Sequence, residues 1–212
     1  MSSQAAMRST RRYFETHAER FDRLYTSPDA ATRVLRQGPR RSREFAVSVV
    51  ASRSSPSVLD VGCGPGRVAE AVMEAGASTY LGIDFSASML ALARERLARY
   101  AGVELVEGNF LELDLGRTYD VVLALGLFDY FKEPAPAAEW MRAHCSSTLV
   151  ATFTRWDWIK APIRHLHYDV LNRCRTFDYT EARAQALLTE AGFSTVEFAV
   201  RGPRGFFVLA AP

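Results

Sequence analysis

The segment Val58–Gly66, with the sequence VLDVGCGPG, is the feature that most restricts how this chain can fold. Its first part belongs to an apolar run, Ser57–Val61, that predicts a buried strand, and a helical pattern begins at Arg67. Three glycines lie between strand and helix. Glycine is needed where the chain turns sharply and its backbone must approach a ligand closely. Because open α/β sheets bind ligands at such junctions, the segment predicts a ligand-binding turn.

The spacing of these glycines indicates which ligand the turn holds. Gly62, Gly64 and Gly66 fall at positions one, three and five, whereas the dinucleotide fingerprint requires one, three and six. The Gly-Lys-Ser/Thr ending of a phosphate-binding loop is absent. Asp60 precedes the glycines, and its carboxylate would repel a pyrophosphate but attract an ammonium or sulfonium group. The sequence therefore predicts a cationic ligand.

Strand and helix patterns alternate through the rest of the chain, which is typical of a mostly parallel sheet covered on both faces. The linker Arg201–Arg204 is too short for a crossover helix, so the last two strands should form an antiparallel hairpin. We predict a doubly wound α/β fold with a seven-stranded, mostly parallel sheet. The predicted strands are 57–61, 79–84, 103–107, 120–125, 148–153, 195–200 and 205–210, and the predicted helices between them are 67–74, 87–99, 137–143 and 180–191.

The motif VLDVGCGPG resembles the first motif of the class I, Rossmann-like S-adenosylmethionine-dependent methyltransferases, and the resemblance covers roughly residues 57–153. It implies an enzyme that binds S-adenosylmethionine and transfers its methyl group. It also implies that the methionine part of the cofactor is held by the following residues of the strand end and loop: Asp60, Gly62, Cys63, Gly64 and Gly66.

A second group of predicted cofactor contacts follows the second predicted strand. Asp84 ends that strand, and its carboxylate offers two oxygens to the two ribose hydroxyls. Phe85 follows it, and Met89 lies one helical turn further on, so both can pack on the adenine.

A third group of predicted cofactor contacts, Asn109–Phe110, follows the third predicted strand. Family members commonly carry an acid in place of Asn109, whose amide can still pair with the adenine edge. The fourth strand ends at Leu125–Gly126, which we expect beside the reactive sulfonium.

Residues 154–178 form a long insertion after the fifth predicted strand, and an insertion of this length is usually functional. The insertion contains many aromatic and basic side chains. Together they suit a flat or apolar acceptor that carries a carboxylate or phosphate. The alternative is that the basic groups are solvated and the aromatic rings pack the insertion onto the sheet. The candidate substrate-binding residues here are Trp156, Trp158, Arg164 and Tyr168.

Methyl transfer needs a general base only when the acceptor carries a proton at neutral pH. His165 and His167 are candidates because imidazole titrates near pH 7. Asp129 and Tyr130, at the end of the fourth strand, compete for the role, and Tyr130 is also a candidate acceptor contact. Metal-dependent relatives carry an Asp-Asn pair beyond the fifth strand, and Trp158 replaces the Asn here, so no metal is expected.

Residues 1–56 read as a helical extension before the domain 57–212. Phe14, Ala18, Phe21 and Tyr25 recur at helical spacing and share one face. This segment resembles the extension of methyltransferases of the magnesium-protoporphyrin type. The resemblance implies a lid in which Tyr13, Phe14, Phe21 and Tyr25 bury the cofactor or the acceptor. A helical hairpin that only covers the sheet is the alternative.

Composition narrows the remaining possibilities. The net charge of +2 does not favour a nucleic-acid binder, and no apolar run is long enough for a signal peptide or a membrane span. We therefore expect a cytoplasmic enzyme that acts on a small molecule, and no feature indicates its oligomeric state. Two alternatives stay open: another reaction at the sulfonium, such as intramolecular cyclisation or aminopropyl transfer, and a non-catalytic S-adenosylmethionine-binding subunit.

Overall fold

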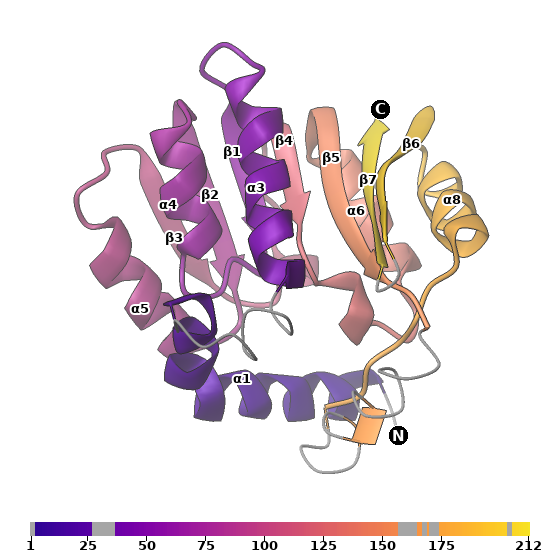
Figure 1. Cartoon of the computed structure of the whole chain (residues 1–212), viewed down its shortest axis with the longest axis horizontal. Helices are drawn as coiled ribbons and strands as arrows, with labels where there is room; N and C mark the ends of the chain where they lie inside the picture. The colour runs from indigo at the N-terminus through magenta and orange to yellow at the C-terminus, as the bar shows by residue number, and fades with distance from the viewer. Residues whose placement is uncertain (1–2, 27–36, 157–164, 167–168, 170–173, 203–204) are drawn as a thin grey trace.

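The computed structural model describes residues 3–26, 37–156, 165–166, 169, 174–202 and 205–212. In this part of the chain seven strands form one sheet in the order β3-β2-β1-β4-β5-β7-β6 (Figure 1). The strands are β1 (Ser57–Val61), β2 (Thr79–Asp84), β3 (Val103–Glu107), β4 (Tyr119–Ala124), β5 (Cys145–Thr154), β6 (Thr195–Gly202) and β7 (Gly205–Ala211).

The predicted fold class is confirmed. Neighbouring strands from β3 to β5 pair in parallel, and β7 pairs antiparallel with both β5 and β6. Strand β5 begins at Cys145, three residues before the predicted start, because Cys145 pairs with Tyr119 at the start of β4. Strand β7 follows β6 closely in the sequence and pairs with both β5 and β6. The last strand of the chain therefore lies inside the sheet, and β6 lies at its edge.

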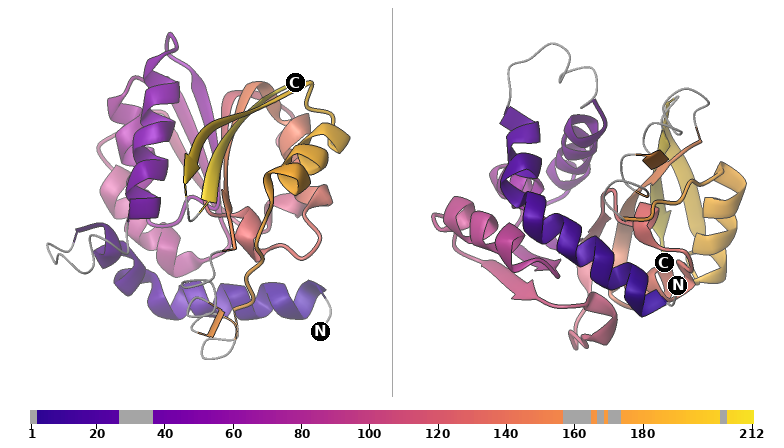
Figure 2. Two further views of the ribbon diagram at one scale, coloured as in Figure 1. Left: turned by 45° about the vertical axis from the view of Figure 1, so that its right-hand side comes forward. Right: turned by 90° about the horizontal axis from the view of Figure 1, so that it is seen from below.

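Helices cover both faces of the sheet (Figures 1 and 2). Along β1 the side chains alternate between two buried cores: Val58 packs with α3, α4 and α5, whereas Leu59 and Val61 pack with α6 and α8. Burial on both faces explains why the inner strands read as apolar runs. The helices are α3 (Gln37–Ala51), α4 (Arg67–Glu74), α5 (Ala87–Leu97), α6 (Ala135–Ala143) and α8 (Glu181–Glu190).

Helix α1 (Ser3–Thr26) crosses the carboxyl ends of the parallel strands, as Figures 1 and 2 show. It departs from helical geometry at His17, where φ is −117°. Ala18 is buried, and the Phe14 ring meets the rings of Phe85 and Tyr130 edge to face, with centroids 6.2 and 5.4 Å apart. One face of α1 therefore packs on loops that follow β2 and β4.

Acidic side chains of α1 fix this position. Asp22 accepts hydrogen bonds of 2.8 Å from Arg67 Nε and 2.9 Å from Arg96 Nη2, which belong to α4 and α5. Glu15 accepts hydrogen bonds from the backbone N–H groups of Ala87 and Ser88, at the start of α5. A carboxylate there satisfies unpaired helix N–H groups and complements the helix dipole. Helix α1 is thus held on the two helices that flank the glycine turn.

We expect Asp22→Ala to loosen α1, because it leaves two partly buried guanidinium groups without their shared carboxylate. The expected loss is about 1.5–3 kcal/mol, the usual range for hydrogen bonds to charged groups. Amide hydrogen exchange of residues 8–23 measures it directly. Glu19→Ala is the matched control, because Glu19 and its partner Arg23 are mostly exposed. Equal protection of α1 in both variants would show that Asp22 does not hold it.

Candidate active site

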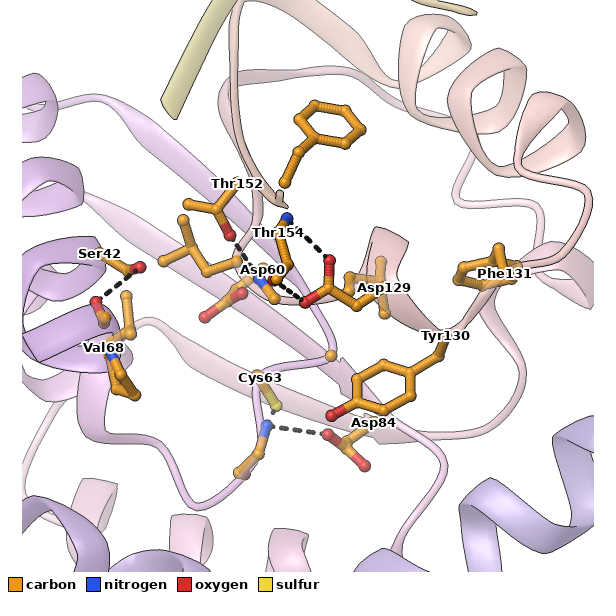
Figure 3. A pocket seen from close by; sticks show the side chains of 18 of the residues that line it. Ser42, Asp60, Cys63, Val68, Asp84, Asp129, Tyr130, Phe131, Thr152 and Thr154 are labelled. Carbon is orange, nitrogen blue, oxygen red and sulfur yellow. Dashed lines mark hydrogen bonds between the residues drawn. The ribbon is translucent and has the colours of Figure 1, made fainter. Parts of the chain in front are cut away.

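A cavity of about 700 Å³ lies at the carboxyl ends of the strands, on the side that α1 covers. This volume is within the ~300–1,000 Å³ of typical small-molecule sites. Figure 3 shows side chains from the ends of β1, β2, β4 and β5 facing one another there. The cavity is therefore at the place where open α/β sheets bind ligands.

The glycine turn forms one wall of the cavity. At Gly62 φ is +79°, and a Cβ would lie 3.1 Å from Leu127 Cδ1, so glycine suits both the backbone conformation and the space. The N–H groups of Gly62 and Cys63 both donate to the carbonyl of Ile83, at 2.8 and 3.1 Å, which ties the turn to β2. Gly62, Cys63 and Gly64 line the cavity, as expected for cofactor-binding residues.

Gly66, the third glycine of the turn, lies against helix α5. Its φ is +75°, and a Cβ there would lie 3.1 Å from both Ala93 Cβ and Leu97 Cδ1. Gly66 therefore lets α4 start close against α5, and it is not among the residues that line the cavity. Its predicted contact with the cofactor stays a prediction, and the structure assigns Gly66 a packing role.

Two buried carboxylates face the cavity, from β1 and β2. Asp84 Oδ2 accepts a hydrogen bond of 2.8 Å from the Gly64 N–H, and Oδ1 accepts one of 2.9 Å from the Ser86 N–H (Figure 3 shows the first). Burial raises the pKa of Asp84 to about 6. Asp60, 2% exposed, accepts a hydrogen bond of 2.7 Å from the Tyr80 hydroxyl. Burial, and then the nearby charge of Asp84, raise the pKa of Asp60 to about 7.

These raised pKa values mark an acidic end of the cavity that favours cations. A positive group bound there would stabilise the ionised carboxylates. Because the carboxylates belong to the ends of β1 and β2, they flank the glycine turn from both sides. The residues present thus fit the amino-acid and ribose parts of S-adenosylmethionine.

The predicted adenine contacts also line the cavity: Phe85, Met89, Asn109 and Phe110. The amide of Asn109 has local partners, since its Oδ1 accepts from the Leu111 N–H and its Nδ2 donates to Glu112. Asn109 thereby caps the short helix η1 (Phe110–Glu112). Its pairing with an adenine edge stays a prediction.

The loop after β4 forms the centre of the cavity, with Leu125, Gly126, Asp129 and Tyr130 in its lining. Both carboxylate oxygens of Asp129 accept hydrogen bonds from Thr154, one from its N–H and one from its hydroxyl (Figure 3). The Gly126 N–H donates to Thr152 Oγ1 at 2.7 Å. Both threonines line the cavity, and we did not predict them, because only the pairing of β4 with β5 brings them there.

The side chains of α1 divide into two groups. Phe14 and Phe21 line the cavity, as predicted. Tyr13 stacks on His17, with ring centroids 4.6 Å apart, and is absent from the lining, so its contact with a ligand stays a prediction. The side chain of Tyr25 lies outside the described part of the chain, as do four other predicted site residues: Trp158, Arg164, His167 and Tyr168.

His165 and Trp156 also lie outside the cavity lining. The two ring nitrogens of His165 contact Asp169 Oδ2 at 2.8 Å and Asp178 Oδ2 at 2.7 Å. Trp156 stacks on His165 and is 44% exposed. These contacts lie within the insertion, and the roles of His165 as a base and of Trp156 as a substrate wall stay predictions.

The wall of the cavity farthest along the sheet comes from segments that we did not predict. The start of α3, Gly38–Ser42, and the start of β7, Gly205–Phe207, both contribute to it. From the insertion, Arg175 and Phe177 join them. No local pattern marks the residues from α3 and β7, whereas Arg175 and Phe177 belong to the insertion that the sequence predicts as part of the acceptor wall.

Comparison with known proteins agrees with this geometry. The profile of a methyltransferase domain matches residues 58–149. Residues 58–149 are a class I methyltransferase domain. The chain is 30% identical over 112 residues to a demethylmenaquinone methyltransferase of Bacillus licheniformis, an alignment that covers 50% of this chain and 48% of that protein. It is 26% identical over 92 residues to a malonyl-[acyl-carrier protein] O-methyltransferase of Halalkalibacterium halodurans, covering 41% and 34%.

The fold extends beyond this domain. The chain is similar in structure to a magnesium protoporphyrin IX methyltransferase from Synechocystis PCC 6803 with bound S-adenosylhomocysteine, with a TM-score of 0.77 and 21% sequence identity. The superposition covers 95% of this chain and 96% of that protein chain. The match over residues 58–149 confirms the predicted methyltransferase family for that segment, and S-adenosylmethionine is the cofactor of this family. The likeness at 21% identity confirms the fold. The chain spans about half or less of the length of the curated relatives that it matches.

Within the described residues, no helix combines the length and the apolar character needed to cross a membrane. In the same residues, no group of three or more His, Cys, Asp or Glu side chains is arranged to hold a metal ion.

The raised pKa values of Asp60 and Asp84 predict how stability depends on pH. Between pH 4 and 7 the folded, unliganded protein binds more protons at these groups than the unfolded chain does. The free energy of unfolding should therefore fall as pH rises through this window. Asp60→Asn should remove much of this fall and raise the midpoint of thermal unfolding at pH 8.

Asp120→Asn is the matched control with the opposite sign. Hydrogen bonds from the N–H and hydroxyl of Ser57 lower the pKa of Asp120, so its contribution is present at neutral pH and lost as pH falls below 4. The variant should therefore unfold at a lower temperature at pH 8. A lower midpoint for Asp60→Asn as well would contradict the acidic-site interpretation.

Proposed function

We propose that this chain transfers the methyl group of S-adenosylmethionine to a small-molecule acceptor. The observation that carries the proposal is one continuous cavity that joins the glycine turn and its two buried carboxylates to an aromatic and basic wall. A methyltransferase needs this arrangement, since it must place a nucleophile in line with the methyl group and exclude water.

The cofactor half of the cavity is built from the turn and the first strands. Gly62, Cys63 and Gly64 would contact the methionine part, with Asp60 facing its ammonium group and Asp84 accepting the ribose hydroxyls. Bound there, S-adenosylmethionine supplies an electrophilic methyl group on a good leaving group. Phe85 and Met89 would pack on the adenine.

The acceptor half is apolar with cations at its edge. Its rings come from β5, the insertion and β7, and three basic side chains, Arg41, Lys132 and Arg175, join the lining. Such a wall suits a flat or apolar molecule that carries a carboxylate or phosphate. The curated relatives named for demethylmenaquinone and malonyl-acyl-carrier protein, and the structural relative named for magnesium protoporphyrin IX, support a small or carrier-bound acceptor.

Asp129 is the side chain best placed to orient the acceptor or to take its proton. It lies in the cavity between the two halves, and Thr154 fixes both of its carboxylate oxygens. Tyr130 lies beside it, under Phe14 of α1. We include residues 1–56 in the enzyme as a lid, because Thr10, Phe14 and Phe21 close the cavity from the α1 side.

The direct test is to incubate the chain with S-adenosylmethionine and a panel of apolar and aromatic acids, and to identify the spent cofactor. S-adenosylhomocysteine together with a methylated acceptor is the expected result. Methylthioadenosine would instead indicate cyclisation or aminopropyl transfer. Binding without any turnover across the panel and in cell extract would favour a non-catalytic subunit.

Arg175→Gln tests the acceptor half. Loss of a charge-assisted contact should raise the KM for an anionic acceptor about tenfold, since such a contact contributes about 1.5–3 kcal/mol. The affinity for S-adenosylmethionine should not change. Arg94→Gln, on the exposed face of α5, is the matched control. An unchanged KM in Arg175→Gln would show that this cation does not contact the acceptor.

A further inference from the structure

Tyr80 lies outside the cavity lining, yet its hydroxyl reaches one of the cavity's two buried carboxylates. The residue is 1% exposed and belongs to β2. Its hydroxyl donates to Asp60 Oδ2 at 2.7 Å. Among the residues that the structure describes, Tyr80 is the one hydrogen-bond donor to the side chain of Asp60.

The register of the sheet explains how a ring on β2 reaches a carboxylate on β1. Asp60 pairs with Gly82, and Tyr80 precedes Gly82 by two residues on the same face of the strand. A Cβ at Gly82 would lie 2.9 Å from Tyr80 Cε1 and 2.8 Å from Cys63 Sγ. The missing side chain at Gly82 therefore leaves the space in which the ring of Tyr80 extends along the strand toward Asp60.

We propose that Tyr80 is a positioning residue that orients Asp60 and favours its ionised form, so that Asp60 binds the cationic amino-acid end of S-adenosylmethionine. This inference rests on the proposed function. A phenol that donates to a buried carboxylate stabilises its charged form. Among the described residues no other group donates a hydrogen bond to the Asp60 side chain, and the charge of Asp84 opposes that of Asp60.

The surroundings of Asp60 support this role. From β2, Asp84 faces it with a like charge, and from the glycine turn the buried Cys63 thiol lies close by. From α4, Arg67 lines the same cavity but pairs with Asp22 of α1. The other charged or titratable lining residues come from α3, from the loop after β4 and from the insertion: Arg41, Asp129, Tyr130, Lys132, Glu133 and Arg175.

The direction of the pKa shifts agrees with the geometry. Burial and Asp84 raise the pKa of Asp60 to about 7, whereas the hydrogen bond from Tyr80 lowers it. Removing the hydroxyl should therefore raise this pKa further and leave Asp60 mostly protonated at pH 7. A neutral carboxyl attracts an ammonium group far less than a carboxylate does.

The test is to measure the affinity of the full chain for S-adenosylmethionine by calorimetry from pH 6 to 8.5, in wild type and in Tyr80→Phe. We expect about five- to tenfold weaker binding in the variant at pH 7, as a rise of about one unit from a pKa of about 7 implies. The ratio of the two affinities should shrink toward pH 8.5, where Asp60 is ionised in both proteins. A loss that is equal at every pH, or no loss, would overturn the proposal.

Two further variants separate this role from a purely structural one. Tyr119→Phe removes the hydroxyl of another buried tyrosine, on β4 and away from the cavity lining, and should leave the affinity unchanged. In an Asp60→Asn background, Tyr80→Phe should change the affinity less than twofold, because the carboxylate on which it acts is gone. A full Tyr80 effect in that background would also overturn the proposal.

A direct readout does not depend on the cofactor. Titration of the Asp60 carboxyl carbon by NMR in the unliganded proteins should give a higher pKa in Tyr80→Phe than in wild type, and an equal or lower value would contradict the proposal. If wild type shows no affinity for S-adenosylmethionine while this shift is observed, the proposed function fails but the Tyr80–Asp60 coupling holds.

Discussion

The hydrogen bond from the Gly64 N–H to Asp84 joins the turn after β1 to the end of β2, and the rest of the site depends on this junction. It is reinforced by the two N–H groups of Gly62 and Cys63 on the carbonyl of Ile83. Together these bonds hold the backbone so close to β2 that Asp60 and Asp84 share one cavity. The proximity of two buried acids is unfavourable in the absence of a cation. The stability of the unliganded fold is therefore coupled to the charge of the ligand that it binds.

Much of this arrangement could be predicted from the sequence, because it follows from local rules. Strands β1, β2 and β3 have the predicted bounds, since each is a short run with strand-forming residues that turn residues bound on both sides. The glycine turn and Asp84 could be placed because their roles depend on neighbouring residues and on the fixed topology of the sheet. Gly66 shows the limit of such reasoning, since its spacing suggests a ligand contact and its surroundings show helix packing.

Residues that act across the sheet could not be predicted in the same way. Tyr80 lies in the middle of a buried strand, where an aromatic residue usually indicates only packing. Its contact with Asp60 depends on the register that sets Asp60 opposite Gly82. His165 shows the reverse case, because a residue type that suits catalysis instead lies between two carboxylates within the insertion. Burial and partners, which the sequence alone does not specify, decide each outcome.

The position of β7 between β5 and β6 has a consequence for how the protein acquires its site. Gly205 pairs with Thr154, so the acceptor wall is closed by a contact that spans some fifty residues of chain. Contacts of long sequence separation carry a large entropic penalty before they gain any stability, and they tend to form late. The cofactor half, by contrast, is assembled from β1, β2 and the turn between them. We therefore expect the glycine turn to become ordered before the proposed acceptor wall closes.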